Sequence, residues 1–166
     1  MAICLALGLL LPFVTGQIPV IGKALSPMHI PVFICGMMLG PVYGGILGFV
    51  LPLLRSGIFG MPAIMPDALA MAPELMTYGI LAGVLLRLLP KRNIYVPVAL
   101  VGSMIGGRLV WGVMRLVLTA FTGEPFTLAM FLAGGFTNAL PGIVLHILIV
   151  PPIVIALRRA GLGLTG

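Results

Sequence analysis

A single acidic side chain, Glu74, lies within an apolar stretch, residues 68–88, that is long enough to cross a bilayer. Membrane-insertion scales assign a cost of about 2.5 to 3.5 kcal/mol to an ionised side chain at the membrane centre, so such groups generally face a bundle interior and have a partner. Tyr78 follows one helical turn later on the same face and can donate its hydroxyl to the carboxylate. We therefore expect a cation elsewhere in the chain to pair with Glu74.

The composition extends this membrane assignment to the whole chain. Of 166 residues, 61% are hydrophobic and 7% are charged, whereas soluble proteins average about 25% charged residues. Helices satisfy their own backbone hydrogen bonds in lipid, and the sequence lacks the alternating segments of about ten residues that are typical of a membrane β-barrel. We predict an all-α integral membrane protein with a single domain over residues 1–166.

Neither nucleic-acid binding nor catalysis is indicated. The formal net charge is +6, but no basic run or soluble face carries it, and membrane orientation explains it better. The sequence has no glycine-rich phosphate loop followed by Lys-Ser or Lys-Thr, no His-Glu-x-x-His motif and no Cys/His cluster with metal-ligand spacing. We expect neither an enzyme nor a resident metal or cofactor, and no ATP hydrolysis by this chain itself.

The apolar runs predict about six transmembrane helices in one bundle. The first run is short, about 22 Å at about 1.5 Å per residue, and a signal peptide is its alternative interpretation, although a basic region and a convincing cleavage site are missing. The expected helices cover residues 1–15, 29–39, 44–59, 68–88, 94–121 and 127–157.

Glycines recur every four residues on both sides of the turn at Pro41. Small residues at this spacing let helix backbones approach closely in a membrane. The pattern predicts that the second and third helices pack as a tight hairpin. The alternative is one long helix over residues 29–59 that is kinked at Pro41. The glycines in question are Gly36, Gly40, Gly44 and Gly48.

The basic residues predict the orientation, because cytoplasmic loops of membrane proteins carry an excess of Lys and Arg. If the turn at Lys91 is cytoplasmic, six crossings place both termini in the cytoplasm. The basic residues on the inner side are then Arg87, Lys91, Arg92, Arg158 and Arg159. The charged residues of the opposite loops are Lys23, Asp67 and Glu124.

The same layout assigns depths to the charges inside the helices. Glu74 lies about six residues, or roughly 9 Å, below the outer end of its helix, and Arg108 lies about 14 residues, or roughly 21 Å, above the inner end of its own. These depths coincide in a hydrocarbon core of about 30 Å. We therefore predict that Glu74 and Arg108 pair in the outer half of the bundle.

A polar patch inside an apolar shell is the expected functional site. Tyr78, Trp111 and Asn138 are close enough in the predicted layout to join the Glu74–Arg108 pair, and converging polar and aromatic groups in an apolar cavity are typical of a small-molecule pocket. The alternative is a buried ion pair that only fixes helix register. His29 and His146 are each more typical of packing histidines than of ligands, and His29, at a loop–helix junction on the outer side, is also a candidate pocket residue. Arg55 near the outer rim is a further candidate.

Several segments together resemble the membrane-embedded substrate-binding subunit, or S component, of energy-coupling factor (ECF) transporters. The resemblance covers nearly the whole chain. The segments are PMHIPV at 27–32, GxxxGPVYG at 36–44, LLRS at 53–56, FGMP at 59–62 and ELxxYG at 74–79.

This resemblance implies a prokaryotic importer of a water-soluble vitamin or precursor, located in the cytoplasmic membrane. The S component would capture the solute outside, and a separate transmembrane coupling protein with two ATPase subunits would drive its release inward. Ala2 and Ala6 match the Ala-x-x-x-Ala pattern with which the family docks the coupling protein. The family's pocket lies on the outer side under the loop after the first helix, here residues 16–28, in agreement with the depths of Glu74 and Arg108.

The motifs at residues 27–31 and 60–62 are closest to the pantothenate-type branch, and pyridoxine, hydroxymethylpyrimidine and niacin are the next candidates. Arg108 or Arg55 is suited to hold a carboxylate by a bidentate contact, whereas Glu74 suits a hydroxyl or ring-nitrogen donor. If Glu74 neutralises Arg108, a neutral vitamin fits better. A self-sufficient small-molecule channel or secondary transporter stays open as the alternative function, and a membrane-bound enzyme lacks a recognisable reactive group.

Overall fold

The computed structural model describes residues 1–14, 25–90, 92–123 and 125–162, and all regular structure in this part of the chain is helical. The elements in chain order are α1 (Ala2–Val14), α3 (His29–Leu39), α4 (Pro41–Phe59), η1 (Ile64–Ala68), α5 (Leu69–Leu88), α6 (Tyr95–Thr122), α7 (Leu128–Leu132), η2 (Ala133–Thr137) and α8 (Leu140–Arg159). The prediction of an all-α fold is confirmed.

Within the described residues, four helical segments are long and apolar enough to cross a membrane. They are Pro41–Phe59, Ile64–Leu88, Tyr95–Phe121 and Leu128–Arg159. The two remaining apolar helices, α1 and α3, are shorter, and the 11 residues of α3 span about 16 Å, roughly half of a hydrocarbon core. The predicted bundle of about six helices is therefore present, with four helices of spanning length rather than six.

Gly40 separates α3 from α4 and rules out the single kinked helix. Its backbone has φ 107° and ψ 169°, outside the helical region, and Pro41 follows as the first residue of α4. Proline suits a helix start because its missing N–H would have no partner there. The alternative of one helix over residues 29–59 is wrong, and α4 begins at Pro41 rather than at residue 44.

The glycines bring three backbones together, not two. A Cβ at Gly44 would lie 2.5 Å from the Cα of Gly36, which confirms the predicted close contact between α3 and α4. A Cβ at Gly36 would collide with the carbonyl oxygen of Gly79 in α5, and one at Gly83 would lie 2.6 Å from that of Gly36. Helix α5 is therefore the third member of this glycine contact.

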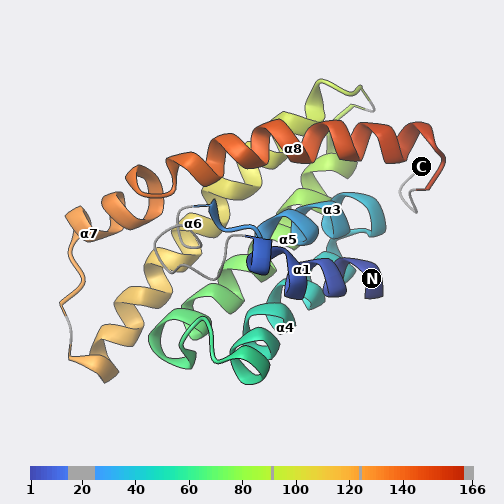
Figure 1. The fold of residues 1–166 in the computed structure, drawn as a ribbon. Coiled ribbons are helices and arrows are strands. Elements are labelled where there is room, and N and C mark those ends of the chain that lie inside the picture. The colour runs from blue at the N-terminus through green and yellow to red at the C-terminus, as the bar shows by residue number, and fades with distance from the viewer. Residues whose placement is uncertain (15–24, 91, 124, 163–166) are drawn as a thin grey trace.

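Helix α5 is the centre of the bundle. It packs against α3, α4 and α6, while α8 contacts α3 and α6, as Figure 1 also shows. Large apolar side chains such as those of Phe33, Leu75 and Leu100 are fully buried between these helices, whereas Leu109 and Leu148 are exposed on the outside, where a membrane protein faces lipid. The polar side chains described below are buried within this core.

Two segments differ from the sequence prediction. Residues 60–67 are expected to form a loop, but a helical turn occurs within Ile64–Ala68 and leads into α5; this turn is broken at Met65, whose backbone is extended (φ −120°, ψ 131°). Residues 127–157 were expected to form one helix, but the segment is divided into α7, the π-helical η2 and α8. Thr127 caps α7 by accepting a hydrogen bond from the backbone N of Met130 (3.3 Å).

Candidate functional site

The predicted ion pair is present in the core. Arg108 Nη1 donates to Glu74 Oε1 at 2.8 Å, and the hydroxyl of Tyr78 donates to the same oxygen at 2.7 Å. Glu74 is 1% exposed and Arg108 is 9% exposed, so both charged groups are buried away from solvent. A buried carboxylate needs such partners. The equal depths inferred from the sequence thus correspond to a direct contact between α5 and α6.

Glycine and helix spacing explain why the contact forms. Tyr78 lies one turn after Glu74 on α5, so both side chains leave the same face toward α6. A Cβ at Gly107 would collide with the Tyr78 ring, so the absence of a side chain there lets the ring lie against α6. Arg108 follows immediately and extends its guanidinium to the carboxylate.

Two histidines from different helices bind one carbonyl oxygen beside this pair. His29 Nδ1 at the start of α3 is 3.0 Å from Ser26 O, and His146 Nε2 of α8 is 3.2 Å from the same atom. A carbonyl oxygen only accepts, so both ring nitrogens donate. Ser26 has a φ of 45°, in the left-handed region that a non-glycine residue rarely adopts. Its carbonyl is thereby held between α3 and α8.

Aromatic contacts join the histidines to the ion pair. The His29 ring lies 5.4 Å from the Tyr78 ring and 5.7 Å from the His146 ring, centroid to centroid. Phe33 contacts both Tyr78 (5.0 Å) and His146 (5.7 Å). We call the polar members of this group the buried polar cluster. They are Ser26, His29, Glu74, Tyr78, Arg108 and His146.

Three nitrogens of the cluster are buried without a hydrogen-bond partner among the described residues: His29 Nε2, Arg108 Nε and His146 Nδ1. Buried polar atoms are usually hydrogen-bonded, and leaving one unpaired costs about 1 to 3 kcal/mol. Three such atoms within one cluster therefore indicate a place where a polar ligand would supply partners.

Two sequence-predicted site residues, Trp111 and Asn138, make their recorded contacts elsewhere. Trp111 packs against Phe126 (5.7 Å) and Phe131 (6.2 Å) rather than against the ion pair. Asn138 is exposed at the end of η2, and its backbone N donates to the carbonyl oxygen of Ala133. The polar patch predicted around Glu74 thus gains His146 and Ser26, which the sequence did not assign to it, instead of Trp111 and Asn138.

Arg55 connects α4 to α1. Its Nη1 donates to Leu9 O at 2.7 Å, and its guanidinium carbon lies 5.3 Å and 5.4 Å from the ring centroids of Phe13 and Phe59. Arg55 is 3% exposed, so its charge is enclosed by these groups. Ala2 and Ala6, which lie on the same helix α1, are both exposed.

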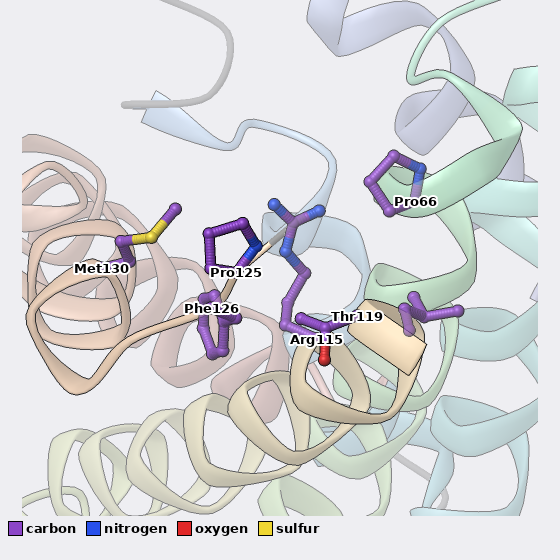
Figure 2. Close-up of a pocket in the computed structure, with 7 residues that line it drawn as sticks. Pro66, Arg115, Thr119, Pro125, Phe126 and Met130 are labelled. Atoms are coloured by element: carbon purple, nitrogen blue, oxygen red, sulfur yellow. The ribbon is translucent and has the colours of Figure 1, made fainter. Parts of the chain in front are cut away.

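A second polar pair lies near the start of α5. Arg115 Nη1 is 3.3 Å from Asp67 Oδ1, and its guanidinium also lies against the rings of Trp111 (6.0 Å) and Phe126 (5.9 Å). Figure 2 shows Arg115 pointing between Pro66 and Pro125 in the shallow pocket at this end of the bundle. Its side chain is 22% exposed, so this pair is far less buried than Glu74–Arg108.

The sequence contained a signal for this second pair that the prediction did not use. Asp67 precedes Glu74 by two helical turns, and Arg115 follows Arg108 by two turns. Because α5 and α6 run antiparallel, the depth argument that pairs Glu74 with Arg108 also pairs Asp67 with Arg115. No group of three or more metal-ligating side chains occurs within the described ranges.

The loop predicted to cover the site, residues 16–28, lies largely outside the described residues, apart from its end around Ser26. Lys23, Lys91 and Glu124 also lie outside them.

Comparison with models of protein families identifies a relative of this chain. The model of the family described as "ECF transporter, substrate-specific component" matches residues 1–154. No curated protein and no solved structure matches the chain significantly. The family match covers most of the chain, including every residue of the buried polar cluster, and agrees with the resemblance seen in the sequence motifs. The chain belongs to the family of substrate-specific components of ECF transporters.

Proposed function

We propose that this chain is the high-affinity binding subunit of an ATP-driven importer and captures a water-soluble vitamin or vitamin precursor. Family membership supports the role of substrate binding. The observation that carries the assignment to a site is the buried polar cluster, where an ion pair and three nitrogens without a hydrogen-bond partner in the described part of the chain lie inside an apolar bundle. Polar groups that converge within an apolar shell are typical of small-molecule sites.

The proposed binding side chains are Glu74, Tyr78, Arg108 and His29. They lie on α3, α5 and α6, so a solute in contact with all four would be bound by three helices at once. The contacts of Trp111, Asn138 and Arg55 do not support a direct role for these residues in the same site. Arg55 instead anchors α1, the helix on which the docking alanines lie.

The ion pair bears on which vitamin is bound. The motifs at residues 27–31 and 60–62 favour pantothenate, whose carboxylate needs a free cation. The guanidinium of Arg108 already shares a carboxylate with Tyr78, and the charges of Glu74 and Arg108 cancel. Uncharged solutes such as pyridoxine or hydroxymethylpyrimidine therefore fit this arrangement better than pantothenate or niacin.

Release into the cell would require partners. In this proposal a transmembrane coupling protein and two ATPase subunits supply the energy, and the coupling protein packs on α1 at Ala2 and Ala6, where small side chains allow close helix contact. The start of α1 and the end of α8 lie at the same end of the bundle as the end of α5 (Figure 1), and Arg87, Arg158 and Arg159 belong to the last turns of α5 and α8. The excess of basic residues supports a cytoplasmic position for it in the cell membrane.

Reconstitution into liposomes tests this function. The purified chain alone is expected to bind a vitamin without accumulating it, and uptake is expected only when a coupling protein and ATPases are included with ATP. Steady uptake by the chain alone would instead show a self-sufficient channel or secondary transporter and would refute the proposal.

A further inference from the structure

The hydrogen bonds to Ser26 define which nitrogen of each imidazole carries a proton. His29 donates through Nδ1 and His146 donates through Nε2, because the carbonyl oxygen that they share can only accept. In an uncharged imidazole the other nitrogen is a bare acceptor. These acceptors, His29 Nε2 and His146 Nδ1, are two of the three unpartnered atoms.

Charge balance indicates that both imidazoles are uncharged. Glu74 compensates Arg108, and each histidine is only 2% exposed. Among the described residues, the side chains in ring contact with the two histidines are Tyr78 of α5 and Phe33 of α3, and neither is an anion that could balance a further positive charge. Burying an uncompensated charge is costly, so protonation of either ring is disfavoured.

We propose that the buried polar cluster selects an uncharged solute with at least two hydrogen-bond donors, and that His29 and His146 accept these bonds. Hydroxyl or amino groups of the solute would pair with the two imidazole acceptors, and an acceptor of the solute would pair with Arg108 Nε. A carboxylate would add an unbalanced negative charge and would face two lone pairs. This inference rests on the proposed function, and it adds His146 as a specificity residue.

Matched substitutions distinguish a ligand-binding role from a purely structural one. The end of a glutamine side chain occupies the position of imidazole Nε2, and that of asparagine occupies the position of Nδ1. His29→Asn therefore keeps a donor for Ser26 and removes the acceptor, whereas His29→Gln does the reverse. At His146 the roles are exchanged, so His146→Gln keeps the donor and His146→Asn keeps the acceptor.

The experiment is calorimetric titration of the purified chain and its four variants with pyridoxine, hydroxymethylpyrimidine, niacin and nicotinamide, the uncharged amide of niacin. The chain is expected to bind uncharged solutes more tightly, with nicotinamide ahead of niacin. His29→Asn and His146→Gln are expected to weaken binding at least about tenfold, the effect of losing one buried hydrogen bond. His29→Gln and His146→Asn keep the acceptor, so each is expected to bind the solute more tightly than the other variant at the same position while unfolding at a lower temperature.

Three results would overturn the inference while leaving a binding function intact. They are tighter binding of niacin than of nicotinamide, equal loss of affinity in all four folded variants, and the reversed pattern, in which the variants that keep the Ser26 donor bind normally. If the variants at one histidine do not fold, the relative affinities of the two variants at the other histidine are sufficient to test the inference. If only a charged vitamin such as pantothenate binds to folded protein, the inference fails and the proposed function stands. If no water-soluble vitamin or precursor binds, both fail.

Discussion

Substitution of Glu74 by glutamine is the perturbation whose effect the structure defines best. Glutamine has nearly the same shape, so its Oε1 can still accept from Arg108 Nη1 and Tyr78, which now lie 2.8 Å and 2.7 Å from the carboxylate oxygen. The change therefore removes the negative charge and little else. Arg108, 9% exposed, is left as an uncompensated buried cation.

Breaking a buried pair from one side costs about 3 to 5 kcal/mol, whereas replacing both charges by neutral groups is often close to neutral. Glu74→Gln and Arg108→Gln are each expected to reduce the free energy of unfolding by about this amount, and the double variant by less than either one. Unfolding in mixed micelles, monitored by circular dichroism, measures the free energy of unfolding of the unchanged chain, the two single variants and the double variant, which together form a double-mutant cycle.

The same variant makes a prediction about specificity. With the cation of Arg108 no longer balanced, Glu74→Gln is expected to gain affinity for niacin relative to nicotinamide, in calorimetric titrations on the fraction that remains folded. Additive losses of stability in the double variant, with a coupling energy below about 0.5 kcal/mol, would refute the reasoning that the two charges compensate each other within the core.

Three further changes test other parts of the structure. Gly36→Ala is expected to prevent folding or lower the unfolding temperature strongly, because its methyl group would collide with the backbone of α5, whereas Gly57→Ala, with open space around it, is expected to be neutral or stabilising in the same thermal assay. Ala6→Trp on the exposed face of α1 is expected to keep solute binding but lose co-purification with the coupling protein, while Ala6→Ser keeps both; loss of binding in the tryptophan variant would contradict this. Asp67→Asn and Arg115→Gln are each expected to cost less than about 1 kcal/mol in the micelle unfolding assay, because this pair is partly exposed, and a loss as large as that of Glu74→Gln would show that exposure does not set the energy of these pairs.

The ion pair was predictable from the sequence because a charge in a membrane helix needs a partner and helix geometry converts residue number into depth. Glu74 and Arg108 met both conditions, and they pair. Trp111 and Asn138 were placed by depth alone, which does not specify the direction of a side chain, and the structure shows them in other contacts. Depth is therefore informative only for groups that must be paired.

His146 was interpreted as a packing residue because a lone histidine in an apolar run carries no partner in its own segment. Its partner is the backbone carbonyl of Ser26, which is distant in the sequence. Every residue has a backbone carbonyl, so residue identities do not show which one a histidine binds. This contact can therefore be found only in the three-dimensional structure. The glycine spacing around Pro41 likewise predicted close helix packing, but it did not identify α5 as the helix that approaches Gly36.

The breaks in the helices were the least predictable part of the fold. The apolar run over residues 127–157 contains no charged residue to mark a break at Ala133–Thr137, where the structure changes to a π-helix. The lengths of α1 and α3 are close to those predicted, but both were counted among six crossings, because an apolar composition shows that a segment can enter lipid and not that it spans it.

Calorimetric titration of the purified chain, without coupling protein or ATPases, tests the central claim most directly. We expect saturable binding of one uncharged water-soluble vitamin or precursor at one site per chain. We also expect this binding to be lost in Arg108→Gln protein that is still folded. Binding that survives this substitution, or no binding by any vitamin to folded protein, would contradict the claim that the buried polar cluster captures the solute.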